Sequence, residues 1–298
     1  MAPQRVQIVE VSPRDGLQAE ERTLPLATKL ELLDRLADAG HTVIEATSFV
    51  SPTAVPQLAD ADDLMARLKR RSGVRYPVLV PNEKGLERAV AAGADEVAVF
   101  VSASESYSRT NLRRSRDDAI ATALAVVESA KARRLRVRAY VSMVIADPDD
   151  GPTDPAEVAK IGARFLAAGA DEVSLGDTIG AGTARHVQAL LAAHRDAKIP
   201  VERLAVHFHD TYGQGLANVL TAIDQGVRIV DASIGGIGGS PFAMRAGGNL
   251  ATEDVVWMLD GMGLVTGLDV RKLAATTTWM AEQLGRELPG RAARALSS

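Results

Sequence analysis

The stretch AAGADEVSLG (167–176) decides the fold, because its pattern returns at three other places in the chain. In each copy a helix ends in alanine or an acidic residue, a glycine caps it, and a buried strand begins three or four residues later. Repeated helix–glycine–strand joints are typical of a parallel sheet that is covered by its own helices. The other copies are LADAGHTVIEA (36–46), AAGADEVAVF (91–100) and AIDQGVRIVDA (222–232).

Outward from these joints, the hydrophobic pattern predicts eight strands, each followed by a helix. The strands are continuously apolar rather than alternating, which indicates that both faces of the sheet are covered. Eight such units close into a (β/α)8 TIM barrel, which leaves no sheet edge exposed. We expect strands at 6–11, 41–46, 75–80, 95–102, 136–144, 171–176, 204–209 and 227–233, and helices at 25–39, within 58–71, and at 83–92, 117–132, 154–168, 183–195, 215–225 and 251–262.

A single α/β domain over 1–298 accounts for the whole chain. We expect the barrel over about 5–265 and extra C-terminal helices over about 268–290, followed by a disordered tip that contains Arg and Ser. An open doubly wound sheet is disfavoured, because no G-x-G-x-x-G follows the first strand.

The charge and composition of the chain argue against several classes of protein. The formal net charge of −4 gives no whole-protein attraction for nucleic acid. The chain has no cysteine, which excludes disulfides, thiolate metal sites and thiol nucleophiles. The first residues, MAPQRVQIVEV, lack the apolar core of a signal peptide, and no apolar run approaches a membrane span. We therefore expect a cytoplasmic protein without a nucleic-acid or membrane partner.

The stretch LAVHFHD (204–210) carries two histidines separated by one residue. On a strand, residues i and i+2 point to the same face, so His207 and His209 would lean into one site. Neutral imidazole is the commonest protein ligand for metals. The alternative is a pair of ordinary histidines near a strand end.

Polar residues at the other strand ends decide between these interpretations. Active sites of such barrels lie where the strands end. One carboxylate, two imidazoles and an amide oxygen suit Mg²⁺ or Mn²⁺, and the absence of thiolates argues against structural zinc. The residues at the strand ends are Arg14, Asp15, Glu45, Asp177, Thr178, His207, His209 and Asn249.

Each of these residues also has a structural interpretation. Asp15 could cap a turn, Glu45 could pair with Arg14, Asp177 could be a helix N-cap, and Asn249 could begin the last helix. Their joint occurrence at successive strand ends favours a functional site.

Long, specific motifs run through almost the whole chain: SPRDGLQAE (12–20), VIEATSFVSPTAVPQLAD (43–60), EVSLGDTIGAGT (172–183), LAVHFHDTYGQGLAN (204–218) and GGSPFAMRAGGNLATED (238–254). In these motifs the chain resembles the 3-hydroxy-3-methylglutaryl-CoA lyase family. The resemblance implies a divalent-metal-dependent TIM barrel that splits a 3-hydroxyacyl thioester into acetyl-CoA and a ketone or ketoacid. It also implies metal ligation by Asp15, His207, His209 and Asn249.

The implied reaction is a retro-Claisen cleavage, in which the 3-hydroxyl loses its proton while the enolate of acetyl-CoA leaves. A metal at the hydroxyl would lower the energy of the alkoxide. Arg14, which the resemblance places at the thioester carbonyl, would stabilise the enolate oxygen. The hydroxyl proton would pass to His207, Asp177 or Glu45, and the sequence leaves this choice open.

Contacts to the CoA part of the substrate are less distinct. The stretch SASESYSRTNLRRSR (102–116) is either a solvated helix end or a contact for CoA phosphates. By resemblance, Asn111 is its better-placed member. The other substrate-binding residues that the resemblance implies are Arg14, Gln18, Ser48 and Thr178.

Ser240 departs from the family, whose glycine-rich loop normally offers a cysteine thought to relay a proton to or from the acetyl carbon. A thiol titrates at about 8.5, and an alcohol is far less acidic. Either Ser240 or a loop-held water replaces the thiol at a reduced rate, or the substrate is a related 3-hydroxyacyl-CoA such as citramalyl-CoA. Met143 and Asp147 likewise stand where the family usually has cysteines.

Two other functions are compatible with these residues. An enzyme that condenses acetyl-CoA with a 2-oxo acid would share the barrel and the metal, but such relatives carry an extra C-terminal regulatory region. A barrel with lost or weak turnover is motivated by Ser240. As partners we expect an acyl-CoA and a second copy of the chain in a homodimer.

Overall fold

The computed structural model describes residues 4–239 and 248–296, which form a closed parallel barrel. The strands of the described residues pair in the order β1-β10-β9-β8-β5-β4-β3-β2. Backbone hydrogen bonds from Glu10 N to Val43 O (3.1 Å) and from Glu45 N to Glu10 O (2.9 Å) join the two ends of this order. The predicted TIM barrel is thereby confirmed. Its strands are β1 (Gln7–Glu10), β2 (Thr47–Ser48), β3 (Val78–Leu79), β4 (Glu96–Ser102), β5 (Arg136–Ser142), β8 (Glu172–Asp177), β9 (Leu204–Phe208) and β10 (Ile229–Ala232).

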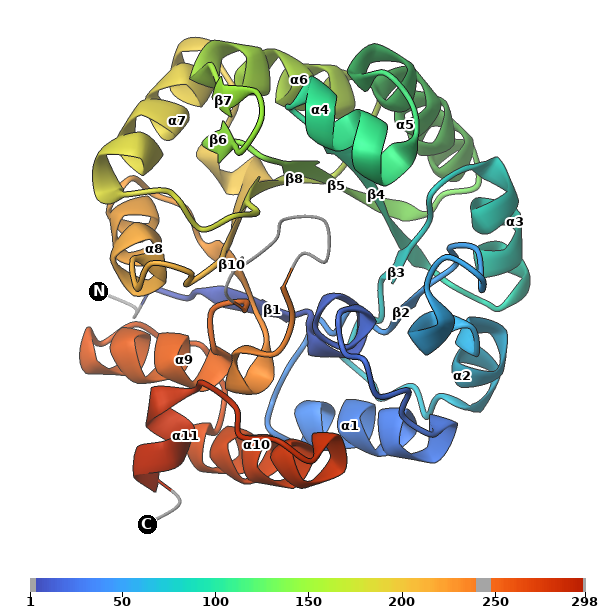
Figure 1. Cartoon of the computed structure of the whole chain (residues 1–298), viewed down its shortest axis with the longest axis vertical. Helices are drawn as coiled ribbons and strands as arrows, with labels where there is room; N and C mark the ends of the chain where they lie inside the picture. The colour runs from blue at the N-terminus through green and yellow to red at the C-terminus, as the bar shows by residue number, and fades with distance from the viewer. Residues whose placement is uncertain (1–3, 240–247, 297–298) are drawn as a thin grey trace.

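The helices form a ring around the strands (Figure 1). Four glycines, one in each repeated joint, have φ values between +76° and +104°. Glycine adopts this left-handed conformation at low cost, so it ends the helix and turns the chain into the next strand. The four are Gly40, Gly93, Gly169 and Gly226. The helices are α1 (Leu26–Asp38), α2 (Ala61–Arg67), α3 (Glu83–Ala91), α5 (Arg116–Ala132), α6 (Pro155–Ala167), α7 (Ala184–Asp196), α8 (Gly215–Asp224) and α9 (Thr252–Gly261).

The main hydrophobic core lies between the strands and the helices. Along β5, the side chains of Val137, Ala139 and Val141 belong to this core. Successive side chains of a strand point to opposite faces, so Arg138 and Tyr140 point into the barrel, where both are buried. The outer face of β5 is therefore apolar, whereas its inner face brings a charge into the barrel.

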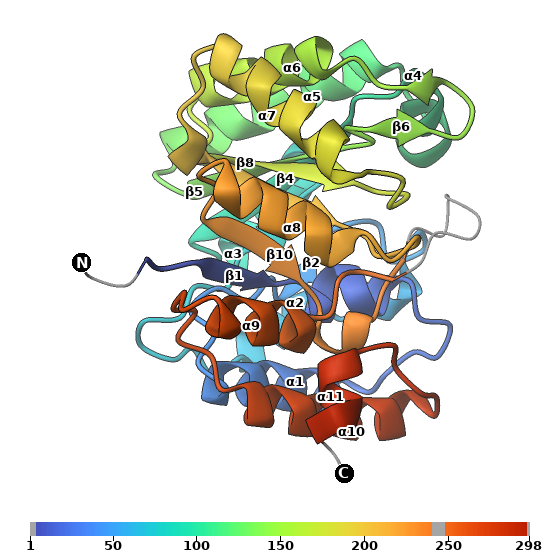
Figure 2. The same cartoon turned by 90° about the vertical axis from the view of Figure 1, so that its left-hand side faces the viewer.

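The C-terminal extension consists of α10 (Val270–Leu284) and α11 (Arg291–Leu296). On one side of the barrel, α10 lies beside α1 and α9, and α11 lies beside α9 and α10 (Figure 2). The expected disordered tip is wrong as far as Leu296. The amides of Arg291 and Ala292 donate to the Asp254 carboxylate over 3.2 and 2.6 Å, which docks α11 onto α9.

Other elements differ from the prediction in length. The strand expected at 41–46 is reduced to isolated bridges, and the regular ladder of β2 begins only at Thr47. The helix expected within 58–71 is α2, which ends at Arg67 because the backbone leaves the helical conformation at Leu68 (ψ 123°). The hairpin of β6 (Ala146–Asp147) and β7 (Gly151–Pro152) and the short α4 (Glu105–Tyr107) were not predicted. Across residues 4–239 and 248–296, no helix combines the length and the apolarity that a bilayer span needs.

Candidate active site

Asp15 is carried by a wide helical turn over Ser12–Gly16, directly after β1. The amides of Arg14, Asp15 and Gly16 all donate to the Val11 carbonyl, over 3.2, 2.8 and 3.1 Å. Three donors converging on one acceptor fix the turn, so Arg14 and Asp15 are held together at the carboxyl end of the barrel.

Two imidazoles from the end of β9 face the same site. The Nε2 atoms of His207 and His209 lie 3.3 Å apart, and Asp15 Oδ2 lies 3.8 Å from His207 Nε2. One possible ligand atom from each of these three residues lies within 4.8 Å of the other two. Asn249 adjoins them: its Nδ2 donates to Asp15 Oδ2 over 2.8 Å, and its backbone bridges to His209. The structure thus brings together all four residues of the predicted ligand set.

This donor set fits a divalent cation. Burial alone would raise the pKa of Asp15, but the charges of Arg14 and the two histidines and the hydrogen bond from Asn249 hold it at about 2. Asp15 is therefore ionised, as a ligand must be. Two ligands at right angles, each about 2.1 Å from an ion, stand about 3 Å apart. The two imidazole nitrogens are spaced close to that distance.

The orientation of His207 is set by a second, inner group of charges. Its Nδ1 lies 3.3 Å from Asp231 Oδ2, and Asp231 also accepts from Ser174 Oγ (2.9 Å) and pairs with Arg138. Burial would lower the pKa of His207, but the hydrogen bond and charge of Asp231 and the charge of Asp15 outweigh it and raise that pKa. A carboxylate behind a histidine is a common way to orient a metal ligand.

Sequence reasoning missed Asp231 and Arg138. Both lie inside strands rather than at strand ends, in RVRAYVS (136–142) and VRIVDAS (227–233). The available signal was a charged residue in the middle of a buried apolar run, which is rare unless the charge is paired.

Arg14 provides a fixed positive charge beside the histidines. Its Nε lies 2.8 Å from Glu45 Oε2 and its Nη1 2.6 Å from Asp15 Oδ1. Burial would lower the pKa of Arg14, but the two carboxylates raise it further above its ordinary value. The Tyr140 hydroxyl also donates to Glu45 Oε2, over 3.2 Å. The structural interpretation of Glu45 as the partner of Arg14 therefore holds.

A cavity of about 610 Å³ opens onto this site. Of the predicted substrate-binding residues, Arg14, Gln18, Thr178 and Asn111 line it, together with His207 and His209. Gln18 Nε2 donates to Asp15 Oδ1 over 2.9 Å, and Thr178 Oγ1 accepts from the Met143 amide over 3.0 Å.

Four predicted residues lie behind the cavity wall or outside the described residues. Glu45 and Ser48 are buried and do not line the cavity. Asp177 accepts from the amides of Gly182 (2.7 Å) and Ala181 (3.2 Å), so it fixes the loop after β8 and is not the N-cap of α7, which is Thr183. Ser240 falls within 240–247, outside the described residues.

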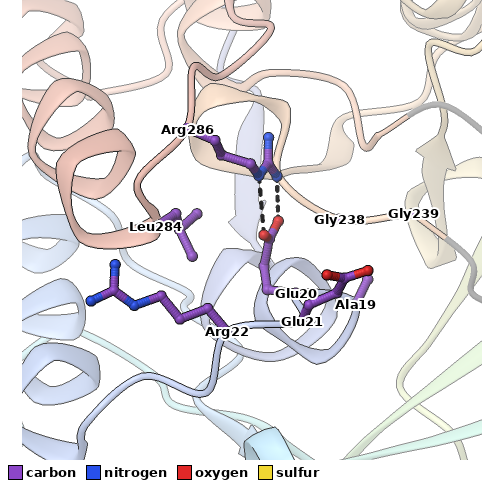
Figure 3. A pocket seen from close by; sticks show the side chains of 8 residues that line it. All are labelled: Ala19, Glu20, Glu21, Arg22, Gly238, Gly239, Leu284 and Arg286. Carbon is purple, nitrogen blue, oxygen red and sulfur yellow. Dashed lines mark hydrogen bonds and ion pairs between the residues drawn. The ribbon is translucent and has the colours of Figure 1, made fainter.

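A second cavity, of about 430 Å³, lies beside the first at Gly238 and Gly239. Arg286, which follows α10, points toward Glu20 across it (Figure 3). The two side chains form an ion pair, with Arg286 Nε 3.1 Å from Glu20 Oε2. The C-terminal extension therefore contacts the segment that follows the Asp15 turn.

Comparison with known proteins places this arrangement in a family. The sequence profile described as HMGL-like matches residues 5–280. The chain belongs to the HMGL-like family. Among its HMGL-like relatives, the mitochondrial hydroxymethylglutaryl-CoA lyase of Arabidopsis thaliana is 49% identical over 295 residues, which is 99% of this chain and 63% of the Arabidopsis protein.

Solved structures of other HMGL-like proteins superpose closely on this fold. The hydroxymethylglutaryl-CoA lyase of Pseudomonas aeruginosa has a TM-score of 0.95 at 44% identity, covering 99% of this chain and 98% of the other. An HMG-CoA lyase of Acinetobacter baumannii, solved in complex with coenzyme A and 3-methylmalate, has a TM-score of 0.93 at 35% identity over 98% of this chain and 95% of the other. Its identity to these lyases assigns the chain to the carbon–carbon lyase class of enzymes.

Proposed function

We propose that the protein cleaves 3-hydroxy-3-methylglutaryl-CoA to acetyl-CoA and acetoacetate by a retro-Claisen step that depends on Mg²⁺ or Mn²⁺. The observation that carries this proposal is the meeting of Asp15, His207 and His209 within 4.8 Å, beside a cavity of about 610 Å³. A cavity of that size suits a small-molecule substrate. The relatives' name, hydroxymethylglutaryl-CoA lyase, agrees with it.

In this proposal, each residue of the site has a distinct role in binding the metal or the substrate. A divalent cation held by Asp15, His207, His209 and Asn249 would act as a Lewis acid toward the substrate hydroxyl. Arg14 would lie against the thioester oxygen and stabilise the negative charge that develops there. Contacts from Gln18 and Thr178 near the metal, and from Asn111 farther along the cavity, would orient the acyl-CoA; Ser48 would support the wall behind them.

The proton of the substrate hydroxyl has three candidate acceptors. His207 presents only Nε2 to the cavity, because Nδ1 faces Asp231, so metal ligation and proton uptake exclude one another there. Glu45 and Asp177 are carboxyls whose pKa is raised by burial, which makes each a stronger base. If Glu45 is the base, Glu45→Gln should abolish the acid limb of the pH profile of kcat/KM. If Asp177 is the base, Asp177→Asn should abolish it instead.

The decisive assay uses purified protein, Mg²⁺ or Mn²⁺ and 3-hydroxy-3-methylglutaryl-CoA, with acetyl-CoA as the measured product. Citramalyl-CoA, tested in parallel, addresses the substrate alternative that Ser240 raises. Condensation of acetyl-CoA with a 2-oxo acid in the reverse assay would favour the condensing enzyme. Bound metal without product from any of these mixtures would favour a barrel that has lost turnover.

We also propose one catalytic domain over 1–298 that acts as a homodimer in the cytoplasm. The Arabidopsis relative is named mitochondrial, so the location is tested directly by fractionation of cells that express this chain. Trp257, on α9, and Tyr212, after β9, are large exposed side chains that a contact with a second copy would cover if it used these elements. Light scattering on the purified protein gives the oligomeric state, and a monomeric mass would refute the dimer.

A further inference from the structure

Glu10, the last residue of β1, is a fully buried acid on the outside of the barrel wall. Its neighbours Val9 and Val11 pack in a small cluster with Val43, apart from the main core between strands and helices. Because successive side chains of a strand alternate, Glu10 points away from the catalytic cavity, toward the helices. It therefore cannot contact a substrate bound near Asp15.

The two oxygens of Glu10 hold three different segments. Oε1 accepts from the amides of Ser12 (3.0 Å) and Ile234 (3.1 Å), and Oε2 accepts from the Thr252 hydroxyl (2.7 Å). His41 Nε2 lies 3.4 Å from Oε2, but burial lowers the pKa of His41 to about 3, so it brings no counter-charge at neutral pH.

Each segment held by Glu10 leads into the active site. Ser12 begins the turn that carries Asp15. Ile234 begins the segment that reaches Gly239, which lines the catalytic cavity. Thr252 is three residues after Asn249. One carboxylate thus ties together two of the segments that carry metal ligands and the segment that borders them.

A second buried acid extends this anchor to the C-terminal helices. Both oxygens of Glu253 accept from the Gly235 amide (3.1 and 3.0 Å), and Oε1 also accepts from Thr277 of α10 (3.2 Å). The Gly290 amide donates to the Gly235 carbonyl over 3.1 Å. At Gly235 (φ +61°) a Cβ would lie 2.6 Å from Leu288 Cδ1, so the extension packs directly against this segment.

We propose that Glu10 is a positioning residue for the metal site: it holds the Asp15 turn and the Asn249 segment in the arrangement that His207 and His209 require. This inference rests on the metal site proposed above. Metal affinity depends on ligands that are held in place before the ion arrives. Mutation of the groups that support the ligands therefore commonly lowers metal affinity about 10- to 100-fold.

Mn²⁺ binding to purified metal-free protein, measured by calorimetry, tests this role independently of activity. Glu10→Asp shortens the side chain by one methylene, so it cannot span all three donors, and we expect Mn²⁺ affinity to fall about tenfold. Glu10→Gln keeps the side-chain length and one acceptor oxygen, and the new side-chain amide can donate to the Thr252 hydroxyl. We therefore expect Glu10→Gln to bind Mn²⁺ with most of the wild-type affinity. Glu96→Asp is the matched control, because Glu96 is a buried acid at the opposite end of β4, paired with Arg75 and Arg136. It should lower thermal stability and leave Mn²⁺ affinity unchanged.

The outcomes separate this role from a purely structural one. Wild-type Mn²⁺ affinity in Glu10→Asp, or an equal loss in Glu96→Asp, would overturn the proposal while leaving the metal site itself intact. Failure of the wild-type protein to bind Mn²⁺ would refute the metal site and the positioning role together. If Glu10→Asp does not fold, Thr252→Val replaces it: this variant removes one of the three hydrogen bonds at nearly constant volume. A several-fold loss of Mn²⁺ affinity in Thr252→Val supports the role, and none overturns it.

Discussion

Two groups of buried acids lie on opposite sides of the barrel wall and differ in their partners. Inside, Asp231 and Glu172 both face Arg138, with Glu172 Oε1 3.0 Å from its Nε. Outside, the hydrogen bonds of Glu10 and Glu253 within the described residues come from neutral amides and hydroxyls. Burial by itself would raise the pKa of Asp231, Glu10 and Glu253. It is overcome at Asp231 by Arg138 and His207, whose charges and hydrogen bonds lower that pKa, but it prevails at Glu10 (about 7) and Glu253 (about 8).

The difference shows what each group can do. An ion pair keeps its charge over the whole physiological pH range, so the inner group can orient His207 at any working pH. Neutral donors stabilise a buried carboxylate less, so the outer group changes protonation near neutrality. The inner group thus provides fixed charge to the site, and the outer group provides a tether whose strength varies with pH.

The largest expected effect comes from removing the cation of the inner group. Arg138→Met removes the buried cation that Asp231 and Glu172 share, and we expect a loss of about 3–5 kcal/mol in the free energy of unfolding. Urea denaturation measures it. Arg136→Met is the control: Arg136 also pairs with Glu172 (3.1 Å), but its side chain is 40% exposed, so the loss should be only about 0–1 kcal/mol. Equal losses in the two variants would remove the distinction between buried and exposed pairs.

The outer group should make stability depend on pH. The folded pKa of Glu10 is raised from 4.5 to about 7, so the folded protein binds more protons than the unfolded chain between these values. The contribution of Glu10 to the free energy of unfolding is therefore fully present below about pH 4.5. It declines by on the order of 3 kcal/mol as the pH rises toward 7. Glu10→Gln should flatten this part of the profile of unfolding free energy against pH. Superimposable profiles for the variant and the wild type would show that Glu10 does not titrate in this range.

The proposed metal ligands, which adjoin the inner group at His207, are tested by His209→Ala. We expect the loss of Mn²⁺ affinity to exceed the roughly 100-fold seen when groups behind a ligand are changed, while cooperative unfolding of the metal-free protein is retained. Asp210→Asn is the matched control, since Asp210 is the next residue and pairs with Arg291 rather than with the cluster. An unchanged metal titration in His209→Ala would refute the ligand assignment.

The smallest expected effect concerns the segment that the outer acids anchor. Ser240→Cys introduces a group acidic enough to relay a proton, and we expect turnover of 3-hydroxy-3-methylglutaryl-CoA to rise by up to roughly tenfold. Ser129→Cys, on α5, controls for a new thiol elsewhere in the chain. A flat or lower rate in Ser240→Cys would mean that the proton takes another path.

The sequence by itself determined the barrel and the residues at its strand ends. Both follow from local signals: a glycine joint such as Gly169 lies within a few residues of the helix and strand that it connects, and the i, i+2 spacing of His207 and His209 sets their common face. The local signal failed where tertiary contacts prevail, as at the tip, which α9 orders through Asp254.

Only the tertiary structure decided which buried charges support the site. Arg138 reaches Asp231 across 93 residues of sequence, and Glu10 reaches Thr252 across 242. No periodicity links positions so far apart, because their contact depends on closure of the whole barrel and on docking of the last helices. The proposed ligands could be identified from the sequence, whereas the buried groups that contact their segments were set by the fold.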